Sequence, residues 1–234
     1  MKSKENAQIP KHVAIIPDGN RRWARSKNLI ELKGHEKSAE KSNVISLIEE
    51  AFALKIDYVS IWGFSTENWK RKKIEVSFLF NLMMKVIRDL REYIAEKEIR
   101  FRHIGRKDRL PKKLALELEL LEKETKNNNK LNLQIFLDYG GRDEIVRSVN
   151  KILNERRKKI TEDEFSLYLD TYGLPDPDFI IRTSGELRLS GLMPFQSVYS
   201  ELYFSEKNFP DFKAEDFRKA VFEFSERKRR FGGN

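Results

Sequence analysis

The chain contains no cysteine, and this absence excludes two kinds of architecture at once. Neither a disulfide-bonded scaffold nor a metal site built on thiolates is possible. Histidine is scarce too, because only three are present and they are too scattered for a zinc site of ordinary spacing. The composition therefore argues against a zinc protein and against a disulfide-bonded fold.

Long apolar runs are missing as well. No stretch approaches the ~18 consecutive apolar residues that a membrane-spanning helix needs. Residues 1–8 are polar and lack the apolar segment of a secretory signal. We therefore expect a cytoplasmic protein, and peripheral contact with the inner face of the membrane stays open at this stage.

Charge, in contrast, is abundant. Of the 234 residues, 35% are charged and 39% are hydrophobic, and the formal net charge is +9. This length and apolar content suffice for one domain with a sizeable core. The positive charge fits nucleic acid, an anionic membrane surface or small anionic substrates, and it also fits a basic surface that is merely solvated. Charge alone does not choose among them.

The order of apolar patterns along the chain predicts the fold class. Six short runs have the composition of buried strands, at residues 13–16, 58–64, 99–104, 131–137, 179–181 and 202–204. Helical spacing occurs at 39–54, 76–95, 114–124, 144–153 and 214–227. This alternation predicts an α/β fold, with a mostly parallel central sheet of about six strands flanked by helices on both faces. We expect a single domain over residues 1–234, with a flexible N-terminus at 1–10 and a basic tail at 227–234.

The segment 12–23 is the most informative part of the chain. A β-branched run is followed by the turn Pro17-Asp18-Gly19-Asn20, and then by Arg21, Arg22 and Trp23 at the start of a helical stretch. A strand that ends in a glycine turn before a helix is suited to bind an anion, and arginine bonds two phosphate oxygens at once. A carboxylate beside phosphate is repulsive unless a cation such as Mg²⁺ lies between them. The segment therefore predicts a site for a metal-bound diphosphate.

Polar groups also follow three other expected strands. These loops cover residues 65–71, 138–142 and 182–190, and they carry arginine, hydroxyl, amide or glycine groups. Because ligands of parallel sheets bind beyond the carboxyl ends of the strands, we expect all four loops on one rim. Such a rim can hold more than one phosphate group.

The same residues carry a family resemblance. The matching blocks, in order along the chain, are 12–24, Gly34-His35, 64–69 with Arg71, 139–142, 181–190, Gln196 with 199–204, and 229–233. Together they resemble the cis-prenyltransferases of the undecaprenyl (polyprenyl) diphosphate synthase family. A single short motif would be weak support, but an ordered set over nearly the whole chain is specific.

The resemblance implies an activity and its partners. The family condenses isopentenyl diphosphate with an allylic diphosphate, of farnesyl or geranylgeranyl type, and makes a new Z double bond each time. It uses Mg²⁺ and works as a homodimer, with the terminal segment at 230–232 reaching the partner's site. The apolar stripe between Leu79 and Ile94 would line a hydrophobic tunnel beside the sheet, and it would also serve as ordinary core.

The resemblance also assigns roles to residues. Asp18 would be the metal-binding and catalytic carboxylate, and Glu201 a second metal-associated one. Asn68 would act in catalysis, and an amide is a poor base, so we expect it to orient a diphosphate oxygen or a water. The substrate-binding residues would be Gly19, Asn20, Arg21, Arg22, Trp23 and His35 for the allylic diphosphate, Ser65, Thr66, Glu67, Trp69 and Arg71 in a mobile loop, and Arg182, Arg188, Leu189 and Ser190 for isopentenyl diphosphate.

One departure from the family pattern bears on affinity. Relatives usually carry arginine where this chain has Glu31, and an anion near a diphosphate should weaken that contact. Lys33 is a candidate substitute.

Two rival functions are weighed against the enzyme. A non-catalytic subunit of a two-component prenyltransferase would lack the metal carboxylate, yet Asp18 and Glu201 are both present. A nucleic-acid-binding α/β domain would not explain acidic residues among the basic ones. We therefore expect no nucleic-acid partner.

Overall fold

The computed structural model describes residues 8–230 and residue 233. All six expected strands are present, as β1 (His12–Ile16), β2 (Tyr58–Ser65), β3 (Ile99–Ile104), β4 (Leu131–Tyr139), β5 (Phe179–Arg182) and β6 (Glu201–Phe204). The five expected helices are α3 (Lys41–Ala53), α4 (Lys73–Glu96), α5 (Lys112–Thr125), α6 (Gly141–Asn154) and α8 (Ala214–Ser225). The helical stretch expected after the first strand is α1 (Asn20–Ser26).

The strands form one sheet in the order β3-β4-β2-β1-β5-β6, and every neighbouring pair is parallel. This confirms the predicted α/β class. β1 lies between β2 and β5, and the chain leaves β1 toward one side of the sheet and β5 toward the other. In open parallel sheets, such a reversal creates a crevice beyond the carboxyl ends of the two strands.

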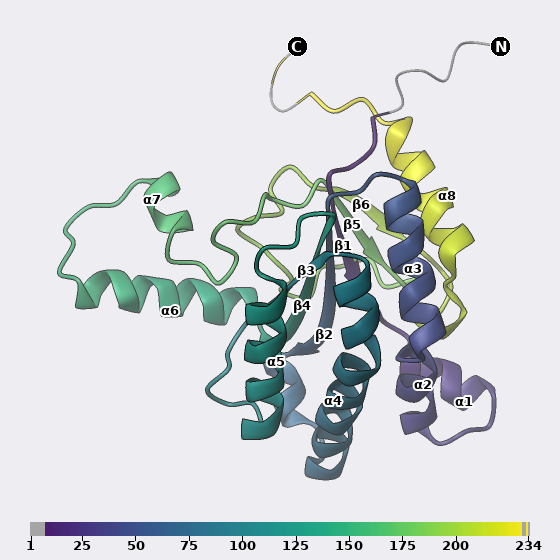
Figure 1. The fold of residues 1–234 in the computed structure, drawn as a ribbon. Coiled ribbons are helices and arrows are strands. Elements are labelled where there is room, and N and C mark those ends of the chain that lie inside the picture. The colour runs from purple at the N-terminus through teal and green to yellow at the C-terminus, as the bar shows by residue number, and fades with distance from the viewer. Residues whose placement is uncertain (1–7, 231–232, 234) are drawn as a thin grey trace.

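The two faces of the sheet are covered differently. Helices α3, α4, α5 and α8 pack on one face (Figure 1) and share one apolar cluster with alternate residues of the strands. The other face is covered by irregular chain, in which Leu192 and Met193 are buried against Ile16, Trp62 and Phe136. The expectation of helices on both faces is therefore met in full on one face only.

Four helical segments of the described chain were not predicted from the sequence patterns. Helix α2 (Glu31–Ser38) has the sequence ELKGHEKS, whose single apolar residue, Leu32, makes no periodic stripe. Helix α7 (Glu162–Ser166) is one short piece that begins at Thr161, whose hydroxyl accepts the backbone N–H of Glu164. The 3₁₀ segments η1 (Thr66–Lys70) and η2 (Phe209–Asp211) are shorter than any useful window.

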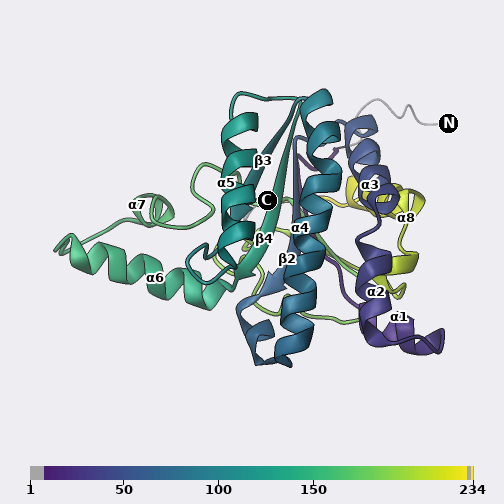
Figure 2. The same ribbon diagram turned by 60° about the horizontal axis from the view of Figure 1, so that its bottom comes forward.

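Helix α6 stands apart from the body of the molecule. Figures 1 and 2 show it running away from the sheet, with α7 alongside its outer part. The long helix α4 instead lies along the sheet, and its 24 residues correspond to roughly 36 Å. Among the described residues, no helix combines the length and hydropathy that crossing a bilayer would require.

The chain ends differ from expectation. Ile9 packs on the core and Pro10 is buried, so part of the segment expected to be flexible belongs to the folded body. In the basic tail, Arg227 pairs with Glu201 and Arg229 with Asp178. The predicted role of residues 230–232 toward a partner falls largely on residues 231 and 232, outside the described chain, and stays a prediction.

Candidate active site

The turn after β1 is built around Gly19. Its φ is +91°, and a Cβ there would lie 2.2 Å from Asn208 Oδ1 and 2.8 Å from the Ser184 Cβ. Only glycine tolerates both constraints. The glycine lets α1 begin directly beyond β1 and brings Asp18 against the end of β5.

Asp18 is paired with Arg182 across the reversal between β1 and β5. One carboxylate oxygen accepts Arg182 Nη2 at 2.7 Å, and the other accepts the backbone N–H of Gly19 at 2.7 Å. Arg182 is 5% exposed and Asp18 is 37% exposed. Arg182 also donates to Ser190 Oγ at 2.7 Å and to the carbonyl of Arg188. The guanidinium thus fixes the 188–190 loop against the Asp18 carboxylate.

Arg22, on α1, also bonds to the loop that follows β5. It donates to the carbonyl and hydroxyl of Ser184, at 2.8 and 2.7 Å, and to Glu186 at 2.5 Å. Glu186 also accepts Arg188, and these two guanidinium donors, Arg22 first, lower the pKa of its carboxyl. Arg22 and Arg188, both predicted to bind diphosphate, are therefore linked by one partly buried acid.

Arg21 and Arg25 form a second cationic group, on α1. Both line the central cavity, and both are near Glu31 at the start of α2, with N–O distances of 3.7 Å and 3.5 Å. The unusual acid seen in the sequence therefore faces the arginines that the diphosphate would use.

His35 lies behind these arginines. Its Nδ1 contacts Asn20 Nδ2 at 3.4 Å, and Asn20 is oriented by the Ser38 hydroxyl, which donates to its Oδ1 at 2.5 Å. Nδ1 is then the acceptor, so Nε2 carries the proton, and it has no partner among the described residues. Burial, with the charges of Arg71 and Arg21, lowers the pKa of His35 to about 4. A neutral imidazole with a free N–H therefore borders the cavity.

The segment after β2 closes another side of the cavity. Asn68 Oδ1 accepts the backbone N–H of Ser65 at 3.2 Å, which leaves its Nδ2 as a donor. Arg71 pairs with Glu75 at 3.0 Å, and burial lowers the pKa of its guanidinium. Ser65, Glu67, Asn68 and Arg71 all line the cavity, as the sequence predicted for this loop.

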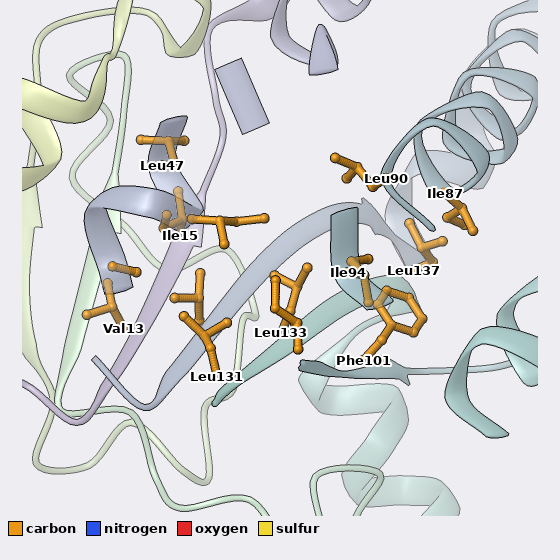
Figure 3. Packing of buried hydrophobic residues seen from close by; sticks show 14 of the residues in the cluster. Val13, Ile15, Leu47, Ile87, Leu90, Ile94, Phe101, Leu131, Leu133 and Leu137 are labelled. Atoms are coloured by element: carbon orange, nitrogen blue, oxygen red, sulfur yellow. The ribbon is translucent and has the colours of Figure 1, made fainter. Parts of the chain in front are cut away.

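Beyond this polar mouth the cavity, of about 570 Å³, continues into the apolar core. Its walls come from α3, α4 and α5 and from the strands β2, β3 and β4. Figure 3 shows Leu47 on one side and Ile87 and Leu90 of α4 on the other, with Leu133 on the sheet between them. The apolar lining includes Val44, Leu47, Ile61, Leu79, Leu82, Met83, Val86, Ile87, Leu90, Ile94, Phe101, Leu121, Leu133 and Ile135.

Several predicted site residues support the cavity without lining it. Trp23 donates to Asp211 at 2.9 Å, and Trp69 donates to Asp138 at 2.8 Å. Thr66 packs against Gly140, where a Cβ would lie 2.2 Å from its Oγ1. Leu189 packs on the cluster at the opposite face of the sheet, and the Arg188 side chain turns to Glu186.

The end of β4 does not join the rim as expected. The strand runs on to Tyr139, and Asp138 is fully buried with φ +52°. Its carboxylate binds Trp69 and Arg109. Asp138 therefore supports η1 from below, and three strand ends, not four, supply the polar mouth.

Glu201, expected as a second metal-associated carboxylate, does not lie beside Asp18 within one chain. Glu201 begins β6 and pairs with Phe179 at the start of β5, whereas Asp18 follows the carboxyl end of β1. Three residues of strand, roughly 10 Å, separate these two edges, and two strand spacings add to this. Glu201 instead pairs with Arg227 at 3.0 Å.

A divalent cation fits the mouth of the cavity only if protein and substrate oxygens bind it together. Among the described residues, no group of three or more acidic or histidine side chains surrounds a common point. Asp18 and Glu67 are the carboxylates that line the cavity, and Mg²⁺ is commonly held by one or two carboxylates together with phosphate oxygens and water. The donor set therefore suits Mg²⁺ delivered with a diphosphate.

Sequence reasoning missed Arg25, Ser38 and Glu186. Arg25 lies one helical turn after Arg21, and this spacing was a usable signal. Ser38 and Glu186 act on other side chains, Asn20 and two arginines, and no local pattern marks such roles. Together the residues form a cavity with a cationic mouth that suits an anionic head group and an apolar interior that suits a hydrocarbon tail.

Comparison with known proteins agrees with this geometry. The family model for undecaprenyl diphosphate synthases matches residues 16–232. An isoprenyl transferase of Aquifex pyrophilus is 45% identical over 225 residues, covering 96% of both chains, and one of Thermotoga maritima is 44% identical over 230 residues, covering 97% of this chain and 98% of its own. The crystal structure of lavandulyl diphosphate synthase from Lavandula x intermedia, in complex with dimethylallyl diphosphate, has a TM-score of 0.91 at 35% identity and covers 96% of this chain and 98% of its own.

Proposed function

The chain belongs to the undecaprenyl diphosphate synthase family of cis-prenyltransferases, and we propose that it condenses isopentenyl diphosphate with an allylic diphosphate primer to make a Z-polyprenyl diphosphate. The observation that carries this proposal is the single cavity that joins a cationic mouth to an apolar interior. An amphiphile with a diphosphate head and a prenyl tail matches both halves. The dimethylallyl diphosphate complex of the lavandulyl diphosphate synthase supports an allylic ligand in this fold.

The first step breaks the bond between C1 of the primer and its diphosphate oxygen, and the electron pair leaves with the diphosphate. Arg21, the backbone N–H groups at the start of α1 and the His35 Nε2–H would stabilise the charge that develops on that oxygen. Such donors favour the transition state over the ground state, so they raise the rate. Mg²⁺ bound at Asp18 would supply further neutralisation of the leaving group.

The second step joins the two substrates. The terminal alkene carbon of isopentenyl diphosphate attacks C1 of the primer, and a proton then leaves C2, which creates the new double bond. Arg182 and Ser190 would orient the isopentenyl diphosphate. Asn68 presents an N–H group, since its oxygen is already occupied by Ser65. It therefore suits the orientation of a diphosphate oxygen or a water that takes the proton.

We propose that the apolar half of the cavity is the tunnel that receives the growing chain. Gly63 sits in its wall, where a Cβ would lie 2.8 Å from Leu137 Cδ2 and 3.5 Å from Met83 Sδ. A Gly63→Ala variant should narrow the passage and shorten the product, as measured by mass spectrometry of the reaction mixture. An unchanged product distribution would remove Gly63 from the tunnel wall.

A homodimer is proposed on the exposed face of α6. Val146, Val149 and Leu153 are 59%, 42% and 62% exposed, and their i, i+3, i+7 spacing forms a stripe on a helix that projects from the body. A second copy that presents the same stripe would bury it. Light scattering should give a dimer mass for the wild type and a monomer mass for Val149→Glu, and a monomeric wild type would reject the proposal.

The cytoplasmic assignment, with peripheral contact at the inner face of the membrane, is likewise proposed. Leu29 and Ile30 are exposed between α1 and α2, Ile74 is exposed in the first turn of α4, and Lys72 and Lys73 lie at the start of that helix. Flotation with vesicles that contain anionic lipid should recover the protein, and neutral vesicles should recover less.

Turnover with labelled isopentenyl diphosphate and a farnesyl diphosphate primer, with and without Mg²⁺, tests the function directly. A labelled polyprenyl product that requires Mg²⁺ is expected. Purified protein that makes no product from any allylic primer would favour the non-catalytic subunit. Tight, salt-sensitive binding to DNA or RNA in place of turnover would favour the nucleic-acid rival.

A further inference from the structure

Glu31 places a negative charge inside a site that must bind anions. It lies in the first turn of α2, and its carboxylate is 3.7 Å from Arg21 and 3.5 Å from Arg25. Both arginines line the cavity mouth. The two cations therefore share one acid, and the α1 side of the mouth offers less positive charge than its arginines suggest.

Stability does not explain this arrangement. All three side chains are at least two-fifths exposed, and none of the N–O distances is that of a tight hydrogen bond. Exposed pairs of this kind contribute little to folding. A carboxylate in the first turn also interacts favourably with the helix dipole, but that role needs no arginine nearby.

We propose that Glu31 sets the affinity of the α1 side of the site for diphosphate, by holding Arg21 and Arg25 and competing with the ligand for them. The inference rests on the proposed function, because it takes the cavity mouth as a diphosphate site. Glu31 lies outside the cavity lining, so it acts through the two arginines rather than by contact with substrate.

The consequence falls on the diphosphate that is left after each condensation. The C1–O bond breaks, and inorganic diphosphate remains beside Arg21 until it leaves. When the Glu31 carboxylate pairs again with Arg21 and Arg25, inorganic diphosphate is released faster. The same competition weakens binding of the primer. Removing the charge should therefore tighten both the allylic diphosphate and the inorganic product, whereas isopentenyl diphosphate, on the Arg182 side, should bind as before.

The chain offers a matched control on the same helix. Glu36 carries the same charge, is 41% exposed where Glu31 is 42%, and pairs with Lys33 at 2.6 Å. It does not line the cavity. Glu36→Gln changes the net charge of α2 by the same amount without touching Arg21 or Arg25, so it separates a local effect from a general one.

Calorimetric titration with inorganic diphosphate, at fixed Mg²⁺ and low salt, is the test. Glu31→Gln should bind diphosphate about tenfold more tightly than the wild type, a gain of about 1.4 kcal/mol. Glu36→Gln should stay within about twofold of the wild type, since screening by water weakens distant surface charges. A helix-capping role for Glu31 would lower the melting temperature of Glu31→Gln and could not tighten the ligand.

A second background tests the part played by the arginines. In Arg21→Gln/Arg25→Gln, adding Glu31→Gln should change the diphosphate affinity by less than about threefold. An undiminished tenfold gain there would overturn the role of the two arginines. Equal binding by the wild type and Glu31→Gln would overturn the inference alone, and a wild type that binds no diphosphate would overturn the proposed function with it.

Steady-state kinetics should agree with the titration. Glu31→Gln should show a lower KM for the allylic primer, an unchanged KM for isopentenyl diphosphate and stronger inhibition by inorganic diphosphate. A fall in both KM values together would mean that Glu31 acts on the whole mouth, which contradicts the proposal.

Discussion

Two histidines, His12 near the amino ends of the strands and His35 near their carboxyl ends, differ in the partners of their ring nitrogens. Burial is the main cause that lowers the pKa of both His12 and His35 to about 4, so both are neutral near pH 7. His12, at the amino edge, bonds through both ring nitrogens, to the Pro175 carbonyl at 2.7 Å and to Ser60 Oγ at 2.8 Å. His35, at the carboxyl edge, keeps Nε2 without a partner among the described residues.

The ion pairs of the two edges repeat this contrast. At the amino edge, Asp178 accepts Arg229 and the backbone N–H groups of Lys11 and His12, so the charges are tied to the fold. At the carboxyl edge, Asp18 and Arg182 also pair, but both line the cavity. A buried unpaired nitrogen alone is no sign of a site, since His103 Nδ1 also has no partner within the described part of the chain and His103 lies outside the cavity lining. The unpartnered group and the cavity must coincide.

The largest effect is expected at Asp18. Asp18→Asn removes the charge that would hold Mg²⁺ and keeps one oxygen, which can accept a hydrogen bond from Arg182 or from the Gly19 N–H but not from both in the present geometry. Turnover should fall by about 10³-fold, since losses of this order follow the removal of one strong electrostatic contact in a transition state. The melting temperature should fall, because the buried Arg182 loses its anionic partner, and a folded variant that keeps more than a tenth of the activity would exclude the metal role.

His12→Ala should instead lower the stability of the fold. The variant leaves Ser60 without its imidazole partner and opens a cavity beneath β1, where His12 is fully buried. We expect a loss of about 3 kcal/mol in the free energy of unfolding, measured with urea. The KM values of the folded enzyme should stay as in the wild type. A rise in the KM for primer would show that the two edges are coupled.

Lowering the pH should reduce the free energy of unfolding through both His12 and His35. An unfolded histidine titrates near 6.5, whereas the folded ones take up a proton only near 4. The unfolded chain then binds more protons between these values, so stability is highest above pH 6.5 and falls as the pH drops toward 4. Each histidine contributes up to about 3 kcal/mol to this loss. Urea titrations across this range should show it, and His12→Ala should show a shallower slope.

Much of the contrast between the edges could be predicted from sequence. The apolar run 13–16 predicts a strand, and Asp18 comes directly after it in the sequence. Because the strands are parallel, Asp18 must therefore lie at the edge of the sheet where the strands end. Pairings that depend on three-dimensional proximity could not be predicted. Glu201 lies within a block that matches the family, but it is the first residue of β6. Asp18 follows the last residue of β1, and β1 and β6 run in the same direction, so the two carboxylates lie at opposite edges of the sheet. Asp138 reads as a loop residue, but burial against Trp69 and Arg109 extends β4 past it.

The smallest expected effect is also the sharpest test of the contrast. His35→Ala removes a ring that lines the cavity and an N–H donor that has no partner among the described residues, and a hydrogen bond to a charged oxygen is worth about 1.5 kcal/mol. The KM for the allylic primer should rise about tenfold, while the free energy of unfolding should fall by only about 1 kcal/mol, because the His35 ring has one weak polar partner, Asn20. His35→Gln can restore a donor and should recover part of the affinity. If His35→Ala lost as much stability as His12→Ala and left the KM unchanged, His35 would be a core residue like its counterpart, and the unpartnered nitrogen would carry no functional meaning.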